Sequence, residues 1–328
     1  MARRRSVTIT SAGALALATI VAGGSAAAAK GGEIGGSGDL YFLNDAWTGK
    51  ANIEFSYGAA SDEVYVGDWD GNGTDTLAVR RGATFHIRNS NSGGGADQVV
   101  TYGRPGDTVL VGDWDGDGKD TFAVRRGAAY HVKNSLTAGP ADHVAVYGRA
   151  EDAVLIGDWD GDGKDTFAVR RGAAYHVKNS IAAGAADHVA VYGRDSDDVY
   201  VGDFDGDGDD SFTVRRGATY YVANAIRAGQ ADRNLTYGRT TDTTLVGDWN
   251  GDGTDTLGVR RAVPTPAPAP APTPPGPPTV PGPPEDLNCD DFDTQAEAQA
   301  EFERWYPIYG DVHGLDRDGN MIVCESLP

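Results

Sequence analysis

Short segments in which apolar and polar side chains alternate make up most of residues 39–261. In one stretch, β-branched or aromatic residues alternate with polar ones over 109–112, 121–126, 129–133 and 143–147, with Gly or Asn-Ser at the segment ends. Alternation with a period of two, bounded by turn residues, is typical of half-buried strands. The pattern predicts four short strands here, with an acidic turn between the first two.

This stretch is one copy of a repeat. Five segments of the form Gly-Asp-aromatic-Asp/Asn-Gly begin 45 residues apart, at Gly67, Gly112, Gly157, Gly202 and Gly247. A period of about 40–50 residues in a strand-rich chain favours the blades of a β-propeller.

The two ends of the repeat region complement each other. Residues 40–58 match only the second half of a unit, and residues 243–261 match only the first half. Two strands from each end would complete one shared blade and so hide the edge strands of the ring. We therefore predict an all-β fold, a five-bladed β-propeller of 45-residue, four-stranded repeats. An open β-solenoid is the alternative, although it would not need complementary half-units.

The acidic turns carry the candidate chemistry. In the second turn, Asp113, Asp115 and Asp117 place carboxylates at loop positions 1, 3 and 5, and Gly116 and Gly118 permit a tight turn. A hard cation that takes about six to eight oxygen ligands, such as Ca²⁺, suits this arrangement better than Mg²⁺, which prefers a smaller, water-rich octahedral shell. The alternative is a set of Asx-type turns that hold no metal.

The repeats resemble the FG-GAP, or integrin α-type, propeller family, whose Asp-x-Asp-x-Asp-Gly hairpin turns bind calcium between the first two strands of a blade. The resemblance covers roughly residues 40–261 and rests on five recurrences of the motif. It implies calcium ligands at Asp68, Asp70 and Asn72; Asp113, Asp115 and Asp117; Asp158, Asp160 and Asp162; Asp203, Asp205 and Asp207; and Asp248, Asn250 and Asp252.

The turns depart from the family at their far end. The family usually has its last acid at loop position 9, where this chain has Thr or Ser. The acid lies one residue earlier, at Asp75, Asp120, Asp165, Asp210 and Asp255. These acids either reach the ion through a tighter turn or pair with the arginines that follow, which would weaken coordination. Asn72 and Asn250 remove charge, so the first and last sites are expected to be the weakest.

Two other recurring features have competing interpretations. The aromatic residues inside the turns (Trp69, Trp114, Trp159, Phe204 and Trp249) either stack on sugars, as in lectins, or pack against the next blade, and packing is favoured. The arginine pairs from Arg80-Arg81 to Arg260-Arg261 point to opposite faces of their sheets. They either line the central channel and attract an anion or form salt bridges to nearby aspartates, and salt bridges are favoured.

Charge and composition narrow the class of protein. The chain has 328 residues, 48 acidic against 28 basic, and a net charge of −20, which argues against a nucleic-acid partner because polyphosphate would be repelled. The repeats supply equivalent copies rather than one unique catalytic constellation, and no common hydrolase motif is present. We therefore expect no enzymatic activity.

The first residues predict export. Arg3, Arg4 and Arg5 precede an apolar stretch that ends in an Ala-x-Ala pattern before Lys30, so residues 1–29 are interpreted as a signal peptide. Residues 30–38 are expected to be a flexible lead-in. No membrane span is expected in the mature chain, which would be secreted or loosely associated with a cell wall.

The C-terminal part differs in composition. Residues 262–284 are rich in proline and predict a semi-rigid polyproline II linker. Residues 285–328 predict a small module with a helix that begins at a Thr294/Glu297 capping box, and Cys289 and Cys324 lie near its ends, where export permits them to form a disulfide.

The module resembles the Excalibur extracellular calcium-binding domain, on its two cysteines, its helix and its terminal Asp-x-Asp-x-Asn-Met-x-x-Cys-Glu segment. The resemblance implies calcium ligands at Asp316, Asp318, Asn320 and Glu325. Asn320 replaces an Asp of the family and Met321 replaces a Gly. The alternative is a module that is stabilised by its disulfide and binds no metal.

Together these features predict a secreted, calcium-binding and non-catalytic binding or adhesion protein. Its partner would be a cell-wall glycan, another carbohydrate or an extracellular protein. A lectin is one alternative class and predicts aromatic rings exposed beside the turns. An extracellular hydrolase or a protein that accompanies a nuclease is the other alternative.

Overall fold

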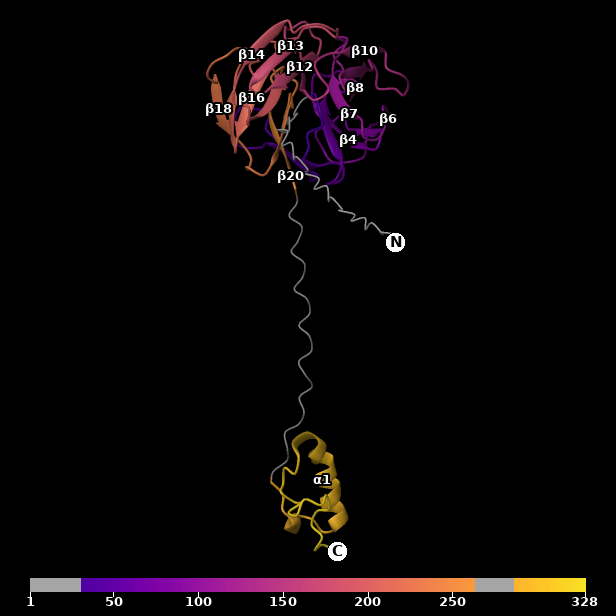
Figure 1. Ribbon diagram of the computed structural model, residues 1–328. Coiled ribbons are helices and arrows are strands. Elements are labelled where there is room, and N and C mark those ends of the chain that lie inside the picture. The colour runs from indigo at the N-terminus through magenta and orange to yellow at the C-terminus, as the bar shows by residue number, and fades with distance from the viewer. Residues whose placement is uncertain (1–30, 263–285) are drawn as a thin grey trace, which may run out of the picture. The chain divides into compact units, whose positions relative to one another are not determined.

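The computed structural model describes residues 31–262 and 286–328. They belong to two compact units that divide between Pro264 and Thr265, and each unit is treated by itself (Figure 1). The predicted signal peptide and almost all of the predicted linker lie outside the described residues.

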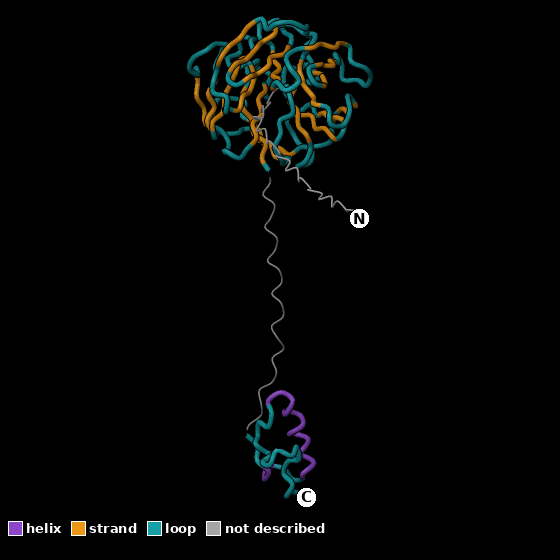
Figure 2. Tube along the Cα trace, in the orientation of Figure 1, coloured by secondary structure: helices purple, strands orange, loops and turns teal. Residues whose placement is uncertain are grey.

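The first unit is a five-bladed β-propeller, as predicted, with five antiparallel four-stranded sheets (Figures 1 and 2). The blades with consecutive strands are β3 (Glu63–Gly67), β4 (Thr76–Arg81), β5 (Thr84–Ile87), β6 (Gln98–Thr101); β7 (Thr108–Gly112), β8 (Thr121–Arg126), β9 (Ala129–Val132), β10 (His143–Val146); β11 (Ala153–Gly157), β12 (Thr166–Arg171), β13 (Ala174–Lys178), β14 (His188–Val191); and β15 (Asp198–Gly202), β16 (Ser211–Arg216), β17 (Thr219–Val222), β18 (Arg233–Thr236).

The fifth blade joins the two ends of the repeat region. Its strand order is β19 (Thr243–Gly247), β20 (Thr256–Arg261), β1 (Leu40–Leu43) and β2 (Ile53–Ser56). β1 pairs with β20 in antiparallel register from Leu40 opposite Arg261 to Leu43 opposite Gly258. The complementary half-units therefore close the ring. The first strands of the blades, β3, β7, β11, β15 and β19, each contact the next around the centre.

Hydrophobic cores lie between neighbouring blades, and the turn aromatics belong to them. Trp69 is 3% exposed and its ring centroid lies 5.2 Å from that of Phe122 in the next blade. Trp114 and Trp159 make the equivalent contacts with Phe167 and Phe212. The packing interpretation is confirmed: these rings are buried beneath the turns and are not presented to a ligand.

The second arginine of each pair makes a salt bridge, as favoured from the sequence. Arg126 donates from Nε (2.9 Å) and Nη2 to the two carboxylate oxygens of Asp107, and Arg171 binds Asp152 in the same way. The other three pairs are Arg81–Asp62, Arg216–Asp197 and Arg261–Asp242. Each pair stabilises the end of a blade that lies opposite its acidic turn.

The first arginine of the pair joins neighbouring blades. Arg215 is 7% exposed and donates from Nη1 to the carbonyl of Asp242 (2.8 Å) and from Nη2 to that of Arg239 (2.7 Å), both just before the next blade. Arg260 does the same across the closure, with an Nη2 contact of 2.8 Å to the carbonyl of Asp62. Each of these guanidiniums therefore satisfies carbonyls of the following blade.

Residues 31–38 pack against the inner strands, whereas a flexible lead-in was expected there. Ile34 is 3% exposed and its backbone N–H donates to Val64 O at 2.9 Å. Gly31 O accepts from Val111 N at 3.1 Å, and Gly38 O accepts from Arg260 Nε at 2.8 Å. These contacts reach several blades, and nothing in the local sequence pattern predicts them.

The second unit is small and contains one α-helix. A short 3₁₀-helix (Cys289–Asp291) precedes α1 (Gln295–Tyr309), and the Thr294 side chain accepts a hydrogen bond from Glu297 N, as expected of a helix cap. Ala298, Phe302 and Trp305 are buried, and a disulfide joins Cys289 to Cys324. Within the described residues, no helix has the length and apolar character needed to span a bilayer.

The salt bridges predict a loss of stability in acid. The hydrogen bond from Arg126 holds the pKa of Asp107 below its ordinary value, and Arg171 lowers the pKa of Asp152 in the same way. A lowered pKa in the folded state gives stability that is present above the unfolded-state value and is lost as the pH falls towards the folded-state value. Urea unfolding of Asp107→Asn and Asp152→Asn should show lower stability than wild type near pH 6, with the difference shrinking below about pH 4. An undiminished difference in acid would contradict the assignment.

Candidate metal centres

Each acidic turn is built around the carboxylate of its first aspartate. In the turn between β7 and β8, Asp113 Oδ1 accepts from Gly116 N (2.8 Å) and Asp117 N (3.2 Å), and Oδ2 accepts from Gly118 N (2.7 Å). Gly116 and Gly118 have φ values of 78° and 83°, which residues with a Cβ seldom adopt. The glycines allow the chain to wrap round one carboxylate, with the bonding expected of an Asx-type turn.

Three turns bring three carboxylates together. Within each, one carboxylate oxygen per residue lies within 4.8 Å of the others: Asp113, Asp115 and Asp117; Asp158, Asp160 and Asp162; Asp203, Asp205 and Asp207. The first acid of each group is half-buried and the other two are exposed. These acidic clusters could hold metal ions. In the first and last turns, Asn72 and Asn250 stand in place of the third or second acid, so those turns have fewer carboxylates to offer.

The electrostatics of the clusters favour a counter-charge. Burial raises the pKa of Asp113, turn N–H groups lower it, and the Asp117 charge raises it, with an overall rise. Burial likewise raises the pKa of Asp158, and burial followed by the charges of Asp207 and Asp203 raises that of Asp205. A bound cation would stabilise the ionised forms that burial and mutual repulsion disfavour.

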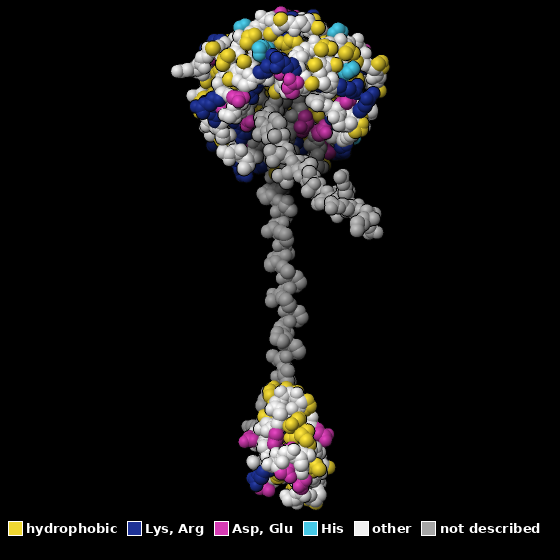
Figure 3. Space-filling model, viewed as in Figure 1, with side chains coloured by type: hydrophobic (Ala, Val, Ile, Leu, Met, Phe, Trp, Pro, Cys, Tyr) yellow, Lys and Arg dark blue, Asp and Glu magenta, His cyan; other side chains and the backbone are white. Residues whose placement is uncertain are grey.

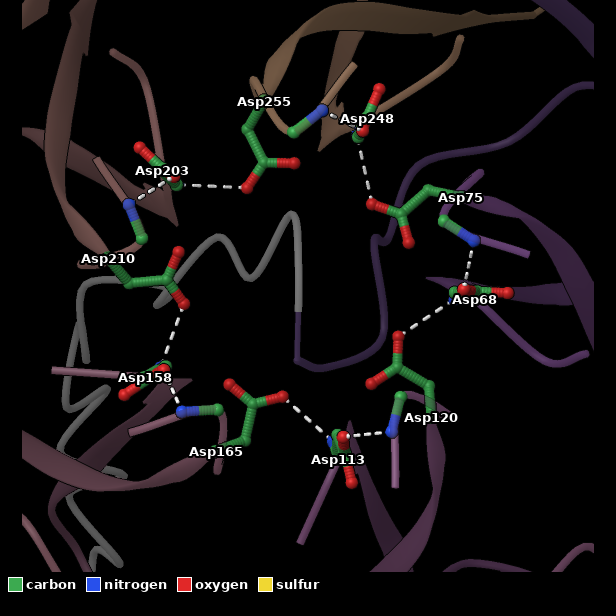
Figure 4. Close-up of a pocket in the computed structure, with 15 residues that line it drawn as sticks. Asp68, Asp75, Asp113, Asp120, Asp158, Asp165, Asp203, Asp210, Asp248 and Asp255 are labelled. Atoms are coloured by element: carbon green, nitrogen blue, oxygen red, sulfur yellow. Dashed lines mark hydrogen bonds between the residues drawn. The ribbon is translucent and has the colours of Figure 1, made fainter. Parts of the chain in front are cut away.

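The five acids at loop position 8 form a ring between blades (Figure 4). Asp120 Oδ2 accepts from Asp68 N of the preceding blade at 2.8 Å, and Asp120 N donates to Asp68 O at 2.7 Å. The same reciprocal pair joins Asp113 to Asp165, Asp158 to Asp210, Asp203 to Asp255 and, across the closure, Asp248 to Asp75. We call this arrangement the inter-blade clasp. It surrounds a cavity of about 260 Å³ at the centre of the propeller.

The clasp explains the glycine before each turn. A Cβ on Gly112 would lie 2.8 Å from Asp165 Cβ and 2.9 Å from its Oδ2. The aspartate of the next blade therefore approaches a backbone that has no side chain in the way, and any larger residue would push the clasp apart.

The structure thus places the position-8 acids differently from the two arrangements considered from sequence. Their carboxylates bind the backbone of the preceding blade, while the arginines that follow pair with Asp62, Asp107, Asp152, Asp197 and Asp242 or with carbonyls. Among the described residues, the position-8 acids are not members of the three carboxylate groups. We assign Asp75, Asp120, Asp165, Asp210 and Asp255 primarily to joining the blades.

One neighbour of the clusters was missed from the sequence. Asn179 Nδ2 donates to Asp160 Oδ2 at 2.8 Å, from the end of the third strand of the same blade. The Oδ1 atoms of Asn179 and of its equivalents Asn89, Asn134 and Asn224 are buried and have no hydrogen-bond partner in the described part of the chain. Their recurrence every 45 residues was visible, but only the fold brings them beside the turns.

The second unit brings its candidate ligands together in one loop. Asp316 Oδ1 accepts from Gly319 N (2.9 Å) and Asn320 N (3.1 Å), much as the propeller aspartates do. Asn320 Nδ2 donates to Asp318 Oδ2 at 3.1 Å and to Glu325 Oε1 at 3.0 Å. Met321 has a φ of 69°, a conformation that is strained for a residue other than glycine. All four predicted residues of this module therefore surround one turn.

Comparison with known proteins gives no independent support for the candidate metal sites. No protein-family model matches the chain, and no curated protein matches it.

The clasp predicts a structural role for the position-8 acids. Asp165→Ala should lower the free energy of unfolding by about 1–3 kcal/mol, because Asp113 N loses its buried acceptor. The loss should be present in chelator as well as in calcium, as measured by urea unfolding. Asp195→Ala, at an exposed aspartate, is the control and should leave stability unchanged. A loss seen only in calcium would instead identify Asp165 as a metal ligand.

Proposed function

We propose that this chain is a secreted, calcium-stabilised and non-catalytic binding protein whose propeller presents the ligand-binding surface. The observation that carries the metal part is the convergence of three carboxylates within 4.8 Å in each of three turns. Ca²⁺ is favoured over Mg²⁺ because the clusters are rich in carboxylate oxygens and lie in open, partly exposed turns that suit a large coordination shell.

The architecture supports the resemblance to FG-GAP propellers. The five blades have their acidic turns between the first and second strands, which is where that family binds calcium. The C-terminal unit supports the Excalibur resemblance in the same limited way, through its disulfide, its helix and the loop that gathers Asp316, Asp318, Asn320 and Glu325.

A binding role suits the repeated surface better than catalysis. On the face of the propeller in Figure 3, acidic and basic side chains are interspersed in small groups. The clusters of carboxylates are near-copies of one another, whereas catalysis needs unlike groups held in one place. We propose a cell-wall glycan, another carbohydrate or an extracellular protein as the partner. The disulfide and the lack of a membrane-spanning helix in the described residues are compatible with an extracellular site.

A calcium titration tests the metal part. Thermal unfolding of the full mature chain should shift to higher temperature in Ca²⁺ and shift less in Mg²⁺, because a ligand at 100-fold excess over its dissociation constant stabilises the folded state by about 2.7 kcal/mol per site. Replacing Asp115 and Asp117 by Asn should remove the part of the calcium-induced rise in melting temperature that comes from this one site. Asp195→Asn is the matched control. Identical melting curves in calcium and in chelator would refute the proposal.

A further inference from the structure

Two cavities occupy equivalent positions on neighbouring blades, the second of which is the blade that closes the ring. The first, of about 330 Å³, is lined by Tyr192, Val214, Arg216, Tyr221 and Asn234. The second, of about 480 Å³, has Tyr237, Val259, Arg261, Phe42 and Glu54 at the corresponding places. Both lie where the end of one blade meets the second, third and fourth strands of the next.

An oriented guanidinium forms one wall of each cavity. Arg216 Nε and Nη2 bind Asp197 at 2.7 and 2.5 Å, and Arg216 Cζ lies 4.7 Å from the centre of the Tyr221 ring. Arg261 is held in the same way by Asp242 and lies 4.2 Å from the centre of the Phe42 ring. The hydrogen bonds to the aspartates use Nε and Nη2, the Arg216 guanidinium also interacts with the Tyr221 side chain, and the arginine side chains are 31% and 21% exposed. Each cavity therefore has a fixed, partly exposed guanidinium in its wall.

The rest of each cavity is rigid and amphipathic. Tyr192 donates its hydroxyl to Tyr221 O at 2.9 Å, and Tyr237 donates to Phe42 O at 2.8 Å, so the wall between the blades is fixed. Val214 and Val259 are buried and supply an apolar floor. The exposed side chain of Asn234 adds an amide at the rim of the first cavity.

These features fit the chemistry of a sugar. A pyranose ring has apolar C–H faces and hydroxyl oxygens at its edges, which match an apolar floor beside planar N–H donors. Each guanidinium is already paired with a buried aspartate in a chain of net charge −20, so neither is left as an unpaired cation for an anion. The lining of the second cavity also contains Lys50, Arg239 and the acidic Glu54. The turn aromatics, in contrast, are buried and cannot stack on a sugar.

We propose that these two cavities are binding sites for neutral saccharides. The proposal rests on the proposed binding function and names its ligand class and its place. Two equivalent sites on one rigid ring would bind a polymeric glycan more tightly than either site alone. His86, His131 and His176 occupy the place of Tyr221 in the other three blades, where an imidazole replaces the phenol or phenyl ring.

A glycan array with neutral and anionic saccharides tests the proposal on the full mature protein. The wild type should bind neutral glycans. The double variant Arg216→Lys/Arg261→Lys keeps the charge opposite each aspartate but removes the planar donor, and it should weaken binding at least about tenfold. Tyr221→His/Phe42→His places in both cavities the residue that the chain itself uses in three blades, and it should also weaken binding.

The matched control makes the same change in two blades where a histidine stands at the place of Tyr221. Arg126→Lys/Arg171→Lys should leave glycan binding unchanged, and thermal unfolding of all variants checks that they fold. Absence of binding to neutral glycans, binding confined to anionic glycans, or an equal loss in the control variant would overturn the proposal. A calcium-dependent melting temperature alongside such a result would show that the metal part of the proposed function stands and that the sugar sites alone fail.

Discussion

The propeller depends on a hydrogen-bonded clasp between the first residue of one acidic turn and the eighth residue of the next. At each of the five junctions, the carboxylate of the position-8 aspartate accepts a hydrogen bond from the backbone N–H of the first aspartate of the preceding turn. The backbone N–H of the position-8 aspartate in turn donates to the carbonyl of that first aspartate. A buried amide without an acceptor costs free energy, so every junction needs its acid. At the other end of the hairpins, arginines such as Arg215 bind carbonyls of the following blade. The two contacts fix each inner hairpin at both ends.

The clasp and the candidate metal sites share residues. The backbone N–H of Asp113 donates to Asp165 in the clasp. Its carboxylate accepts N–H groups of its own turn and lies close to the carboxylates of Asp115 and Asp117. A cation bound by these carboxylates would therefore act on the same residue that holds the next blade. This coupling gives a physical reason why a bound metal would stabilise the fold: the turn that would hold it is also part of the junction between blades.

Most of the fold follows from periodicity in the sequence. The 45-residue period, the alternation within each unit and the complementary half-units predicted the strands and the closure, because these are local or additive properties. The candidate ligands at positions 1, 3 and 5 could also be located from spacing alone. The role of Asp165 could not, because its partner Asp113 lies in another blade and a shift of one residue changes which neighbour it meets. The contacts of Ile34 are invisible for the same reason.

The repeats are least uniform at the point where the ring closes. The clasp between Asp248 and Asp75 joins residues that lie 173 positions apart in the chain, so it forms only after the ends meet. The two turns that supply this clasp are also those in which Asn250 and Asn72 replace an acid. If cations bind the turns, weaker binding on both sides of one junction would leave that junction more dependent on its own hydrogen bonds and on the pairing of β1 with β20. Arg260, which is 1% exposed and binds carbonyls of Gly38 and Asp62, adds a second contact across the same closure. The contacts of the lead-in segment and this arginine thus lie where cations would contribute least.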